Sequence, residues 1–144
     1  MLELRHIKKS YDNVTILEDM NLKIQDGEIV SILGPSGCGK TTLLNLVLGL
    51  TPADQGQILF DGKDITNVPM EERGFNIVFQ DYALFPNLNV YKNITYGLRN
   101  KPDISTKEEV DEFIELLGLK EHLNKKIDQL SGGQKQRVAL ARTM

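Results

Sequence analysis

Residues 29–50 read IVSILGPSGCGKTTLLNLVLGL, and this stretch decides the fold. An apolar, β-branched run comes first, a glycine-rich segment follows, and a second apolar segment ends the stretch, so we expect a strand, a tight loop and a buried helix that is apolar nearly all round. Four positions satisfy the pattern G-x-x-x-x-G-K-[ST] of a phosphate-binding loop: Gly34, Gly39, Lys40 and Thr41. A glycine-rich strand-to-helix turn with an exposed lysine is the structural alternative.

The composition of this loop explains why it suits phosphate. Glycines let the backbone turn sharply and approach a ligand, so the amides of about Gly37 to Thr42 can point inward at a helix N-terminus, where the helix dipole favours an anion. Lys40 can then reach the β- and γ-phosphates, and the Thr41 hydroxyl suits Mg²⁺. The predicted contacts in this loop are Gly34, Ser36, Gly37, Cys38, Gly39, Lys40, Thr41 and Thr42.

Composition limits the other classes of function. The chain has 144 residues, 40% of them hydrophobic, and a net charge of −3, so it fits one globular domain without the basic footprint of a nucleic-acid-binding protein. Its apolar runs are too short to cross a bilayer. The single cysteine, Cys38, excludes an intrachain disulfide, and we expect no redox role for it. His6 and His122 lack metal-ligand spacing and are expected at the surface or in a hairpin.

Turn signals divide the N-terminal half into short strands. Tyr11-Asp12-Asn13 and Asp61-Gly62 each mark a turn, and in the first strand Leu2 and Leu4 alternate whereas Ile7 is out of phase. The expected strands are residues 2–8, Val14–Ile24, Gln57–Phe60, Lys63–Ile65 and Asn76–Phe79.

Capping patterns mark helices in the C-terminal half. Thr106-x-x-Glu109 and Ser131-x-x-Gln134 both have the spacing of a capping box. Another short helix is expected at Lys120–Lys126, and Lys101–Ser105 is the candidate boundary between sub-regions. The glycines that follow Ser131 suit a second anion site at a helix N-terminus, although a simple capped helix has the same pattern.

Three motifs together resemble the nucleotide-binding subunits of ATP-binding cassette (ABC) transporters. Gly34–Thr41 is similar to the Walker A loop, Gln80 to the Q-loop glutamine and Leu130–Gln134 to the LSGGQ signature. Two further stretches, Val78–Pro86 and Val90–Leu98, resemble importer ATPases of the sugar, polyamine and ferric-iron branch. The resemblance covers essentially the whole chain.

This resemblance implies an α/β P-loop NTPase fold with an N-terminal antiparallel β-subdomain and a helical subdomain. Residues 1–80 would form the β-subdomain and P-loop core, about 81–130 the helical subdomain, and 131–144 the signature helix. Family members continue into strands that carry the Walker B Asp-Glu pair. Those C-terminal strands are missing from this sequence, which would leave an apolar sheet edge beside the phosphate-loop strand.

The resemblance also implies roles for residues outside the loop. Tyr11 would stack on adenine, the alternative being a hairpin-edge aromatic. Gln80 would contact Mg²⁺ and the attacking water, with Lys40 as the other catalytic residue and Thr41 as the other metal contact; a polar strand terminus is the alternative for Gln80. Four signature residues would contact ATP in trans, across a head-to-tail dimer: Ser131, Gly132, Gly133 and Gln134.

The implied partners are a second ATPase subunit, membrane permease subunits that dock near Gln80–Leu98 and, indirectly, a solute-binding protein, but no nucleic acid. The aromatic residues of Gln80–Leu98 have an alternative role as core of the helical subdomain. The expected location is cytoplasmic, at the inner face of the cell membrane. A soluble cassette ATPase of DNA repair or translation is disfavoured; repair types carry long coiled-coil insertions, and the roughly ninety residues between the two motifs leave no room for one.

The implied function is ATP hydrolysis coupled to solute uptake, with ATP and Mg²⁺ as cofactors. Because the Walker B aspartate and the general base cannot be placed in this sequence, we expect the chain alone to bind ATP–Mg²⁺ and to hydrolyse it poorly. The alternative is a nucleotide-binding fragment without hydrolytic activity.

Overall fold

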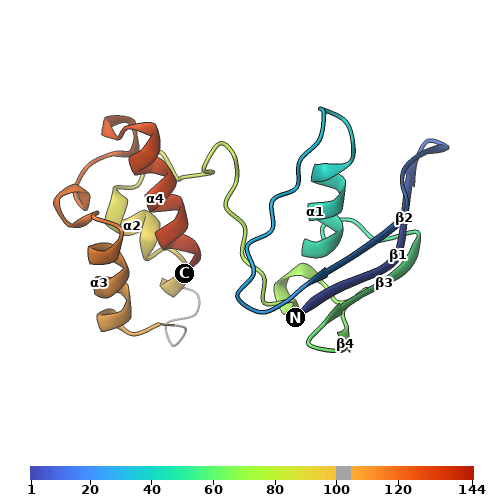
Figure 1. Cartoon of the computed structure of the whole chain (residues 1–144). Helices are drawn as coiled ribbons and strands as arrows, with labels where there is room; N and C mark the ends of the chain where they lie inside the picture. The colour runs from blue at the N-terminus through green and yellow to red at the C-terminus, as the bar shows by residue number, and fades with distance from the viewer. Residues whose placement is uncertain (100–104) are drawn as a thin grey trace. The chain divides into compact units, whose positions relative to one another are not determined.

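A computed structural model describes residues 1–99 and 105–144. The chain divides into two compact units, Met1–Phe75 and Asn76–Met144 (Figure 1). Of the predicted boundary Lys101–Ser105, all but Ser105 lies outside the described residues. The predicted subdivision at residues 80 and 130 stays a prediction.

The first unit contains a four-stranded antiparallel sheet in the order β2-β1-β3-β4. Both predicted hairpins are present. Asp12 and Asn13 join β1 to β2 with positive φ angles of 48° and 65°, the backbone of a two-residue turn that matches the twist of the strands. The strands are β1 (Leu2–Tyr11), β2 (Val14–Ile24), β3 (Gln55–Phe60) and β4 (Lys63–Asp64).

A bulge in β1 explains why Ile7 is out of phase in the sequence. The pairing of β1 with β3 shifts between Arg5 and Lys8, and His6 has a positive φ of 51°. The bulge adds one residue to β1, so the Ile7 side chain points to the same face of the sheet as the Leu4 side chain. Both are therefore buried despite their odd spacing. Gly56 allows this close approach, since a Cβ there would lie 2.4 Å from the His6 carbonyl oxygen.

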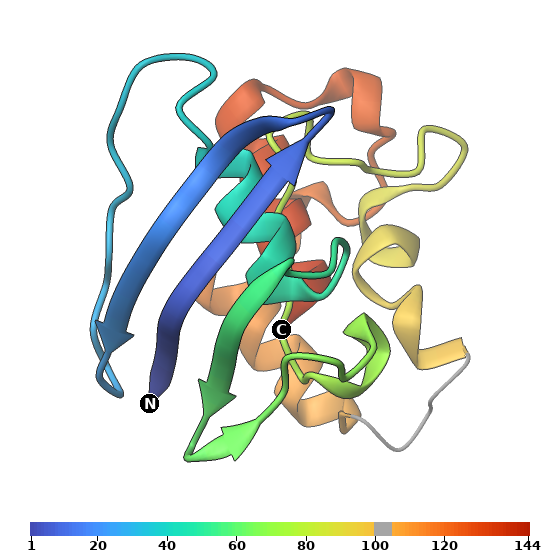
Figure 2. The same ribbon diagram turned by 90° about the vertical axis from the view of Figure 1, so that its right-hand side faces the viewer.

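Helix α1 (Lys40–Leu48) packs on one face of this sheet (Figure 2). The predicted burial holds for only part of the helix, because Leu44 remains 49% exposed. A capping Gly49 with φ of 81° ends the helix and donates its N–H to the Leu46 carbonyl. The buried core consists of Leu4, Ile7, Leu43, Leu46, Ile58 and Ile65.

Arg73 fixes the C-terminal end of α1 to the segment that follows the sheet and contains the 3-10 turn η1 (Met70–Glu72). Its side chain is only 5% exposed and donates to the carbonyl oxygens of Leu46 and Val47, both at 2.9 Å. It also donates to the carbonyls of Thr66 and Val68. Burial lowers the pKa of Arg73, and the carbonyl oxygens with the negative end of the helix dipole compensate its charge.

Two predicted strands are not formed, and this corrects the sequence interpretation. Residues 28–35 have no strand structure, and Ile29 and Leu33 are 96% and 89% exposed. Asn76–Phe79 is not a strand either. A strand needs a hydrogen-bonded neighbour, and no described residue pairs with either segment. The apolar sheet edge expected beside the phosphate-loop strand is therefore absent from the described part of the chain.

The second unit is helical. The predicted capping boxes are present at Thr106 with Glu109 and at Ser131 with Gln134. Within the predicted helix Lys120–Lys126, only a 3-10 turn is formed. The elements are α2 (Val90–Ile94), η2 (Gly97–Arg99), α3 (Lys107–Leu116), η4 (Lys120–His122), η5 (Ile127–Gln129) and α4 (Gly132–Thr143).

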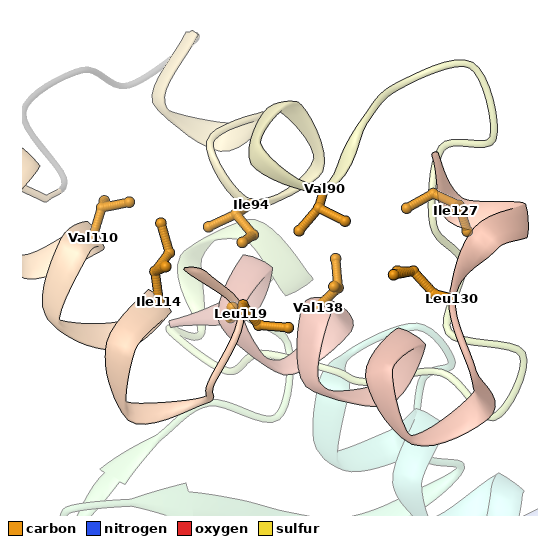
Figure 3. Packing of buried hydrophobic residues seen from close by; sticks show 9 residues of the cluster. Val90, Ile94, Val110, Ile114, Leu119, Ile127, Leu130 and Val138 are labelled. Atoms are coloured by element: carbon orange, nitrogen blue, oxygen red, sulfur yellow. The ribbon is translucent and has the colours of Figure 1, made fainter. Parts of the chain in front are cut away.

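One apolar cluster holds these helices together, with its side chains converging between α2, α3 and α4 (Figure 3). Leu119 and Val138 lie at its centre and are fully buried. Among the described helices, none combines the length and the apolar content needed to cross a membrane. The cluster comprises Val90, Ile94, Val110, Ile114, Leu119, Ile127, Leu130, Val138 and Ala141.

Candidate functional site

The predicted phosphate loop lines a pocket of about 290 Å³ in the first unit. Strand β1 contributes Tyr11, strand β2 contributes Ile16, and the loop with the first turn of α1 contributes the rest. The sequence predicts every lining residue except Ile16, an apolar side chain without a motif to mark it. The lining residues are Tyr11, Ile16, Ser36, Gly37, Gly39, Lys40, Thr41 and Thr42.

The start of α1 offers backbone N–H groups to this pocket. The Leu43 N–H donates to the Gly39 carbonyl at 2.8 Å, the first hydrogen bond of the helix. The N–H groups of Lys40, Thr41 and Thr42 precede this bond, so they have no acceptor within the helix. Gly39 has a φ of 90°, a backbone that favours glycine, and it brings no side chain to cap these donors. The arrangement is that of an anion site.

Lys40 is folded back onto the loop that contains it. Its Nζ donates to the carbonyl oxygens of Gly34 at 2.8 Å and Pro35 at 2.7 Å, and it lies 3.6 Å from Cys38 Sγ. Gly34 and Cys38 do not line the pocket. They shape the loop from within, since a Cβ on Gly34 would lie 2.6 Å from Cys38 Sγ.

Tyr11 is held at the end of the first hairpin by a charged pair. Lys9 Nζ lies 5.2 Å from the centre of the Tyr11 ring and 2.7 Å from Asp54 Oδ1. The other oxygen of Asp54 accepts the Ser10 N–H at 2.7 Å. Hydrogen bonding from Lys9, and then from Ser10, holds the pKa of Asp54 below its ordinary value. Lys9 is only 7% exposed, whereas the Tyr11 ring is 44% exposed and free to stack on a ligand.

Sequence reasoning misses this pair. Lys9 and Asp54 are 45 residues apart. Neither belongs to a motif, and only the pairing of β1 with β3 brings them together. No signal in the sequence marked Lys9, because it follows the expected strand of residues 2–8 and is out of phase with Leu2 and Leu4.

The predicted metal contacts lie in different units. Thr41 lines the pocket of the first unit, whereas Gln80 is an exposed turn residue of the second. Among the described residues, no group of three or more His, Cys, Asp or Glu side chains is arranged to hold a metal. A threonine hydroxyl fits Mg²⁺ that keeps most of its waters and takes its other ligands from phosphate. The role of Gln80 stays a prediction.

Four signature residues form the N-cap and first turn of α4: Ser131, Gly132 and Gly133 are exposed, and Gln134 is half-buried. Ser131 Oγ accepts the Gln134 N–H at 3.3 Å, and Gln134 Oε1 accepts the Ser131 N–H at 2.9 Å. Gly132 and Gly133 are exposed beside them. Space is open at Gly133, where a Cβ would meet nothing within 4 Å.

His122 departs from its expected surface position. The ring is partly buried, and its Nε2 lies 3.0 Å from Gln134 Nε2. The other histidine, His6, is exposed as expected and pairs with Asp19 at 2.8 Å. No pattern in the sequence connects His122 with the signature, because the turn at residues 120–122 creates the contact.

The segment Gln80–Leu98 combines packed and exposed aromatic side chains. Phe85 and Tyr96 stack with their ring centres 4.2 Å apart, and the Arg142 guanidinium lies 5.5 Å from the Phe85 ring. Asn93 is fully buried and fixes the preceding loop, donating to the carbonyls of Phe85, Leu88 and Asn89. Phe85 and Tyr96 nevertheless remain 37% exposed, which is compatible with both roles expected for this segment.

Comparison with known proteins decides the family, because residues 17–144 match the family described as ABC transporter. The chain belongs to the ABC transporter family. This confirms the resemblance carried by the Walker A loop, Gln80 and the LSGGQ signature.

The relatives of this ABC transporter chain include import proteins. It is 52% identical over 146 residues to the spermidine/putrescine import ATP-binding protein PotA of Haemophilus influenzae, with all of the chain and 39% of that protein covered. It is 51% identical over 147 residues to the protein of the same name from Spiroplasma citri, covering the whole chain and 42% of that protein. The chain thus spans about two fifths of the length of these relatives.

A solved structure supports the fold class. A bacterial ABC transporter cassette determined as a dimer superposes with a TM-score of 0.81 at 34% identity, covering all of this chain and 69% of the cassette. The predicted α/β P-loop fold class with an antiparallel β-subdomain and a helical subdomain is confirmed, although the phosphate-loop strand is not formed here.

Proposed function

We propose that this chain is an ATP-binding part of an ABC importer ATPase and that it binds ATP in the pocket lined by Tyr11, Lys40 and Thr41. One observation carries the proposal. The lysine ammonium, the unpaired N–H groups of the first helical turn and an exposed aromatic ring all line the same pocket. Together they match the two chemically different ends of a nucleoside triphosphate.

The phosphate chain binds at the start of α1. Lys40 exchanges its bonds to the Gly34 and Pro35 carbonyls for stronger, charge-assisted bonds to the β- and γ-phosphates. Thr42 contacts the α-phosphate, and the Thr41 hydroxyl is a ligand of hydrated Mg²⁺. The metal, when bound, neutralises negative charge on the phosphates.

The adenine stacks on Tyr11. The ring is exposed at the mouth of the pocket, and Ile16 offers an apolar surface beside it. Lys9 and Asp54 limit the movement of the ring, so less conformational entropy is lost when the base binds.

The signature residues act on a nucleotide that another ABC subunit holds. Ser131, Gly132 and Gly133 form an exposed helix N-terminus, the kind of site that favours phosphate, and Gln134 completes it. The solved cassette with the same fold is a dimer, which supports pairing of two subunits.

In the complete importer, hydrolysis of ATP drives solute uptake. Gln80 positions Mg²⁺ and the attacking water, and the surface Gln80–Leu98 docks on membrane permease subunits, which places the ATPase at the inner face of the cell membrane. A solute-binding protein delivers the solute to the permease. The names of the relatives make spermidine and putrescine the first solutes to test.

A second candidate function, nucleotide binding without turnover, applies to the 144-residue chain by itself. None of the residues that line the pocket is an aspartate or glutamate. Attack on the γ-phosphate needs an acceptor group that orients the water, and the loop alone does not provide one. We expect this chain to bind ATP and to release no phosphate.

Calorimetric titration with ATP, ADP and AMP in the presence of Mg²⁺, beside a phosphate-release assay, tests both statements. ATP and ADP should bind with similar affinity and AMP at least about tenfold more weakly, because AMP lacks the β-phosphate that Lys40 contacts. Absence of saturable ATP binding would contradict the site. Phosphate release that depends on Lys40 would contradict the second candidate function and leave the site itself intact.

A further inference from the structure

The Gln134 side chain uses both of its polar atoms to connect two parts of the second unit. Its Oε1 accepts the Ser131 N–H at 2.9 Å, and its Nε2 lies 3.0 Å from His122 Nε2. The opposite orientation of the amide would place an NH₂ group against the Ser131 N–H, so the NH₂ group faces the histidine. His122 Nε2 is therefore an acceptor, and the ring proton lies on Nδ1.

The other nitrogen of the same ring indicates that this contact selects the tautomer. His122 Nδ1 is buried without a hydrogen-bond partner among the described residues. Because Nδ1 has no partner in either tautomer, it does not select one. The Gln134 amide at Nε2 does, because an Nε2–H tautomer would place two N–H groups face to face.

The His122 backbone is held rigidly. Its N–H donates to the Leu119 carbonyl and its own carbonyl accepts the Lys125 N–H, both at 2.9 Å. Leu119 is fully buried in the apolar cluster of the second unit. The ring is thus anchored to the core of the second unit and contacts the half-buried Gln134, whereas Ser131, Gly132 and Gly133 of the same turn are exposed.

We propose that His122 is a positioning residue for the signature: it fixes the Gln134 amide, which in turn fixes Ser131. The Gln134 N–H occupies a lone pair of Ser131 Oγ, so the hydroxyl proton remains available for an acceptor outside the turn. If the Gln134 side chain is released, both halves of the capping box loosen and the hydroxyl loses its orientation. Only the binding of a phosphate by the Ser131 hydroxyl rests on the proposed function. The tautomer of His122 and the capping box of Ser131 with Gln134 do not depend on it.

Long-range ¹H–¹⁵N NMR of the wild-type chain tests the contact directly. His122 should show the Nδ1–H tautomer, with an unprotonated Nε2. A predominant Nε2–H tautomer would overturn the inference, and this readout needs no nucleotide, partner chain or variant.

Hydrogen exchange at the Ser131 amide tests the positioning role. His122→Leu should lower its protection about 2- to 12-fold, the range for one neutral hydrogen bond. His122→Gln should restore protection, because the Oε1 atom of the new glutamine can accept the Gln134 NH₂ group at the position that His122 Nε2 occupies in the wild type. His6→Leu is the matched control, since it removes the exposed histidine of the other unit, and it should leave Ser131 unchanged.

Unchanged protection in a folded His122→Leu chain would overturn the inference, as would a failure of His122→Gln to differ from it. The effect of His122→Leu on function is measured separately, as the ATP-driven pairing of two copies of the chain. Reduced pairing in His122→Leu, with ATP affinity of the single chain unchanged, is the expected result. If the wild type itself never pairs, the trans role in the proposed function fails, whereas the exchange data still decide the role of His122.

Discussion

Lys40 Nζ donates to the carbonyl oxygen of Gly34 at 2.8 Å, so the ammonium of the phosphate loop is bound by the loop itself. A second bond, to the Pro35 carbonyl, completes this arrangement. The lysine is thereby kept beside the free N–H groups of the first turn of α1. We infer that nucleotide binding exchanges these two neutral acceptors for phosphate oxygens, which form stronger bonds with an ammonium group.

Replacement of Tyr11 tests the adenine end of the pocket. Base–aromatic stacking contributes about 1–3 kcal/mol, so Tyr11→Leu should raise the Kd for ATP about 5- to 150-fold. Tyr11→Phe keeps the ring and should bind nearly as the wild type does. Calorimetric titration of the two variants makes the comparison. An equal loss of ATP affinity in Tyr11→Leu and Tyr11→Phe would show that the Tyr11 hydroxyl matters and that its ring does not.

The Lys9–Asp54 pair makes stability depend on pH. The pKa of Asp54 is lowered by Lys9 first and Ser10 second, so the ionised carboxylate stabilises the folded state. This contribution is fully present above the pKa of an unfolded aspartate, about 3.9, and is lost as the pH falls through the lower folded value. Wild type and Asp54→Asn should therefore differ most in free energy of unfolding near neutral pH and converge in acid.

Urea unfolding at several pH values between neutrality and about 3 measures this difference. Asp111→Asn, on the exposed face of α3, controls for the loss of one carboxylate. A difference between wild type and Asp54→Asn that grows in acid would contradict the assignment.

Local signals predict the parts of the structure that nearby residues determine. The turns at Asp12-Asn13 and Asp61-Gly62, the capping boxes and the glycine-rich loop each depend on a few adjacent residues, and all of them are present. The bulge at His6 was visible only as the phase error at Ile7.

Contacts between distant residues explain what the sequence could not predict. Residues 29–33 have the composition of a strand, yet no described segment pairs with them, and composition alone does not supply a neighbour. The pairs Lys9–Asp54 and His122–Gln134 are created by the sheet register and by a 3-10 turn. Within the site, the sequence predicts every residue that lines the phosphate-loop pocket except Ile16, and it misses the residues that hold Tyr11 and Gln134 in place.

Arg73 is expected to carry part of the stability of the first unit. Arg73→Met keeps the aliphatic stem but leaves buried carbonyls without donors, so it should lower the free energy of unfolding by about 2–4 kcal/mol. Arg5→Met, at an exposed arginine, is the matched control and should have a small effect. Equal effects of the two substitutions in urea unfolding would contradict the structural role of Arg73.

Replacement of Ser131 separates binding from pairing. Ser131→Arg puts a large cation where the phosphate of another subunit would lie, so it should block ATP-driven pairing and leave the Kd for ATP of the single chain unchanged. The lost cap should cost about 1 kcal/mol of stability. Gln136→Arg adds the same charge on an exposed position of α4 and serves as the control. Analytical ultracentrifugation with and without ATP reads the pairing. Loss of ATP affinity together with pairing would contradict a trans role.

The central claim is that Lys40 binds the phosphates of ATP, and titration of Lys40→Ala with ATP–Mg²⁺ tests it most directly. A hydrogen bond to a charged group contributes about 1.5–3 kcal/mol, so the account predicts a Kd raised at least about tenfold, with an intact fold by circular dichroism. Lys63→Ala, at an exposed lysine of β4, should bind as the wild type does. Unchanged affinity for ATP in Lys40→Ala would contradict the assignment of the phosphate loop.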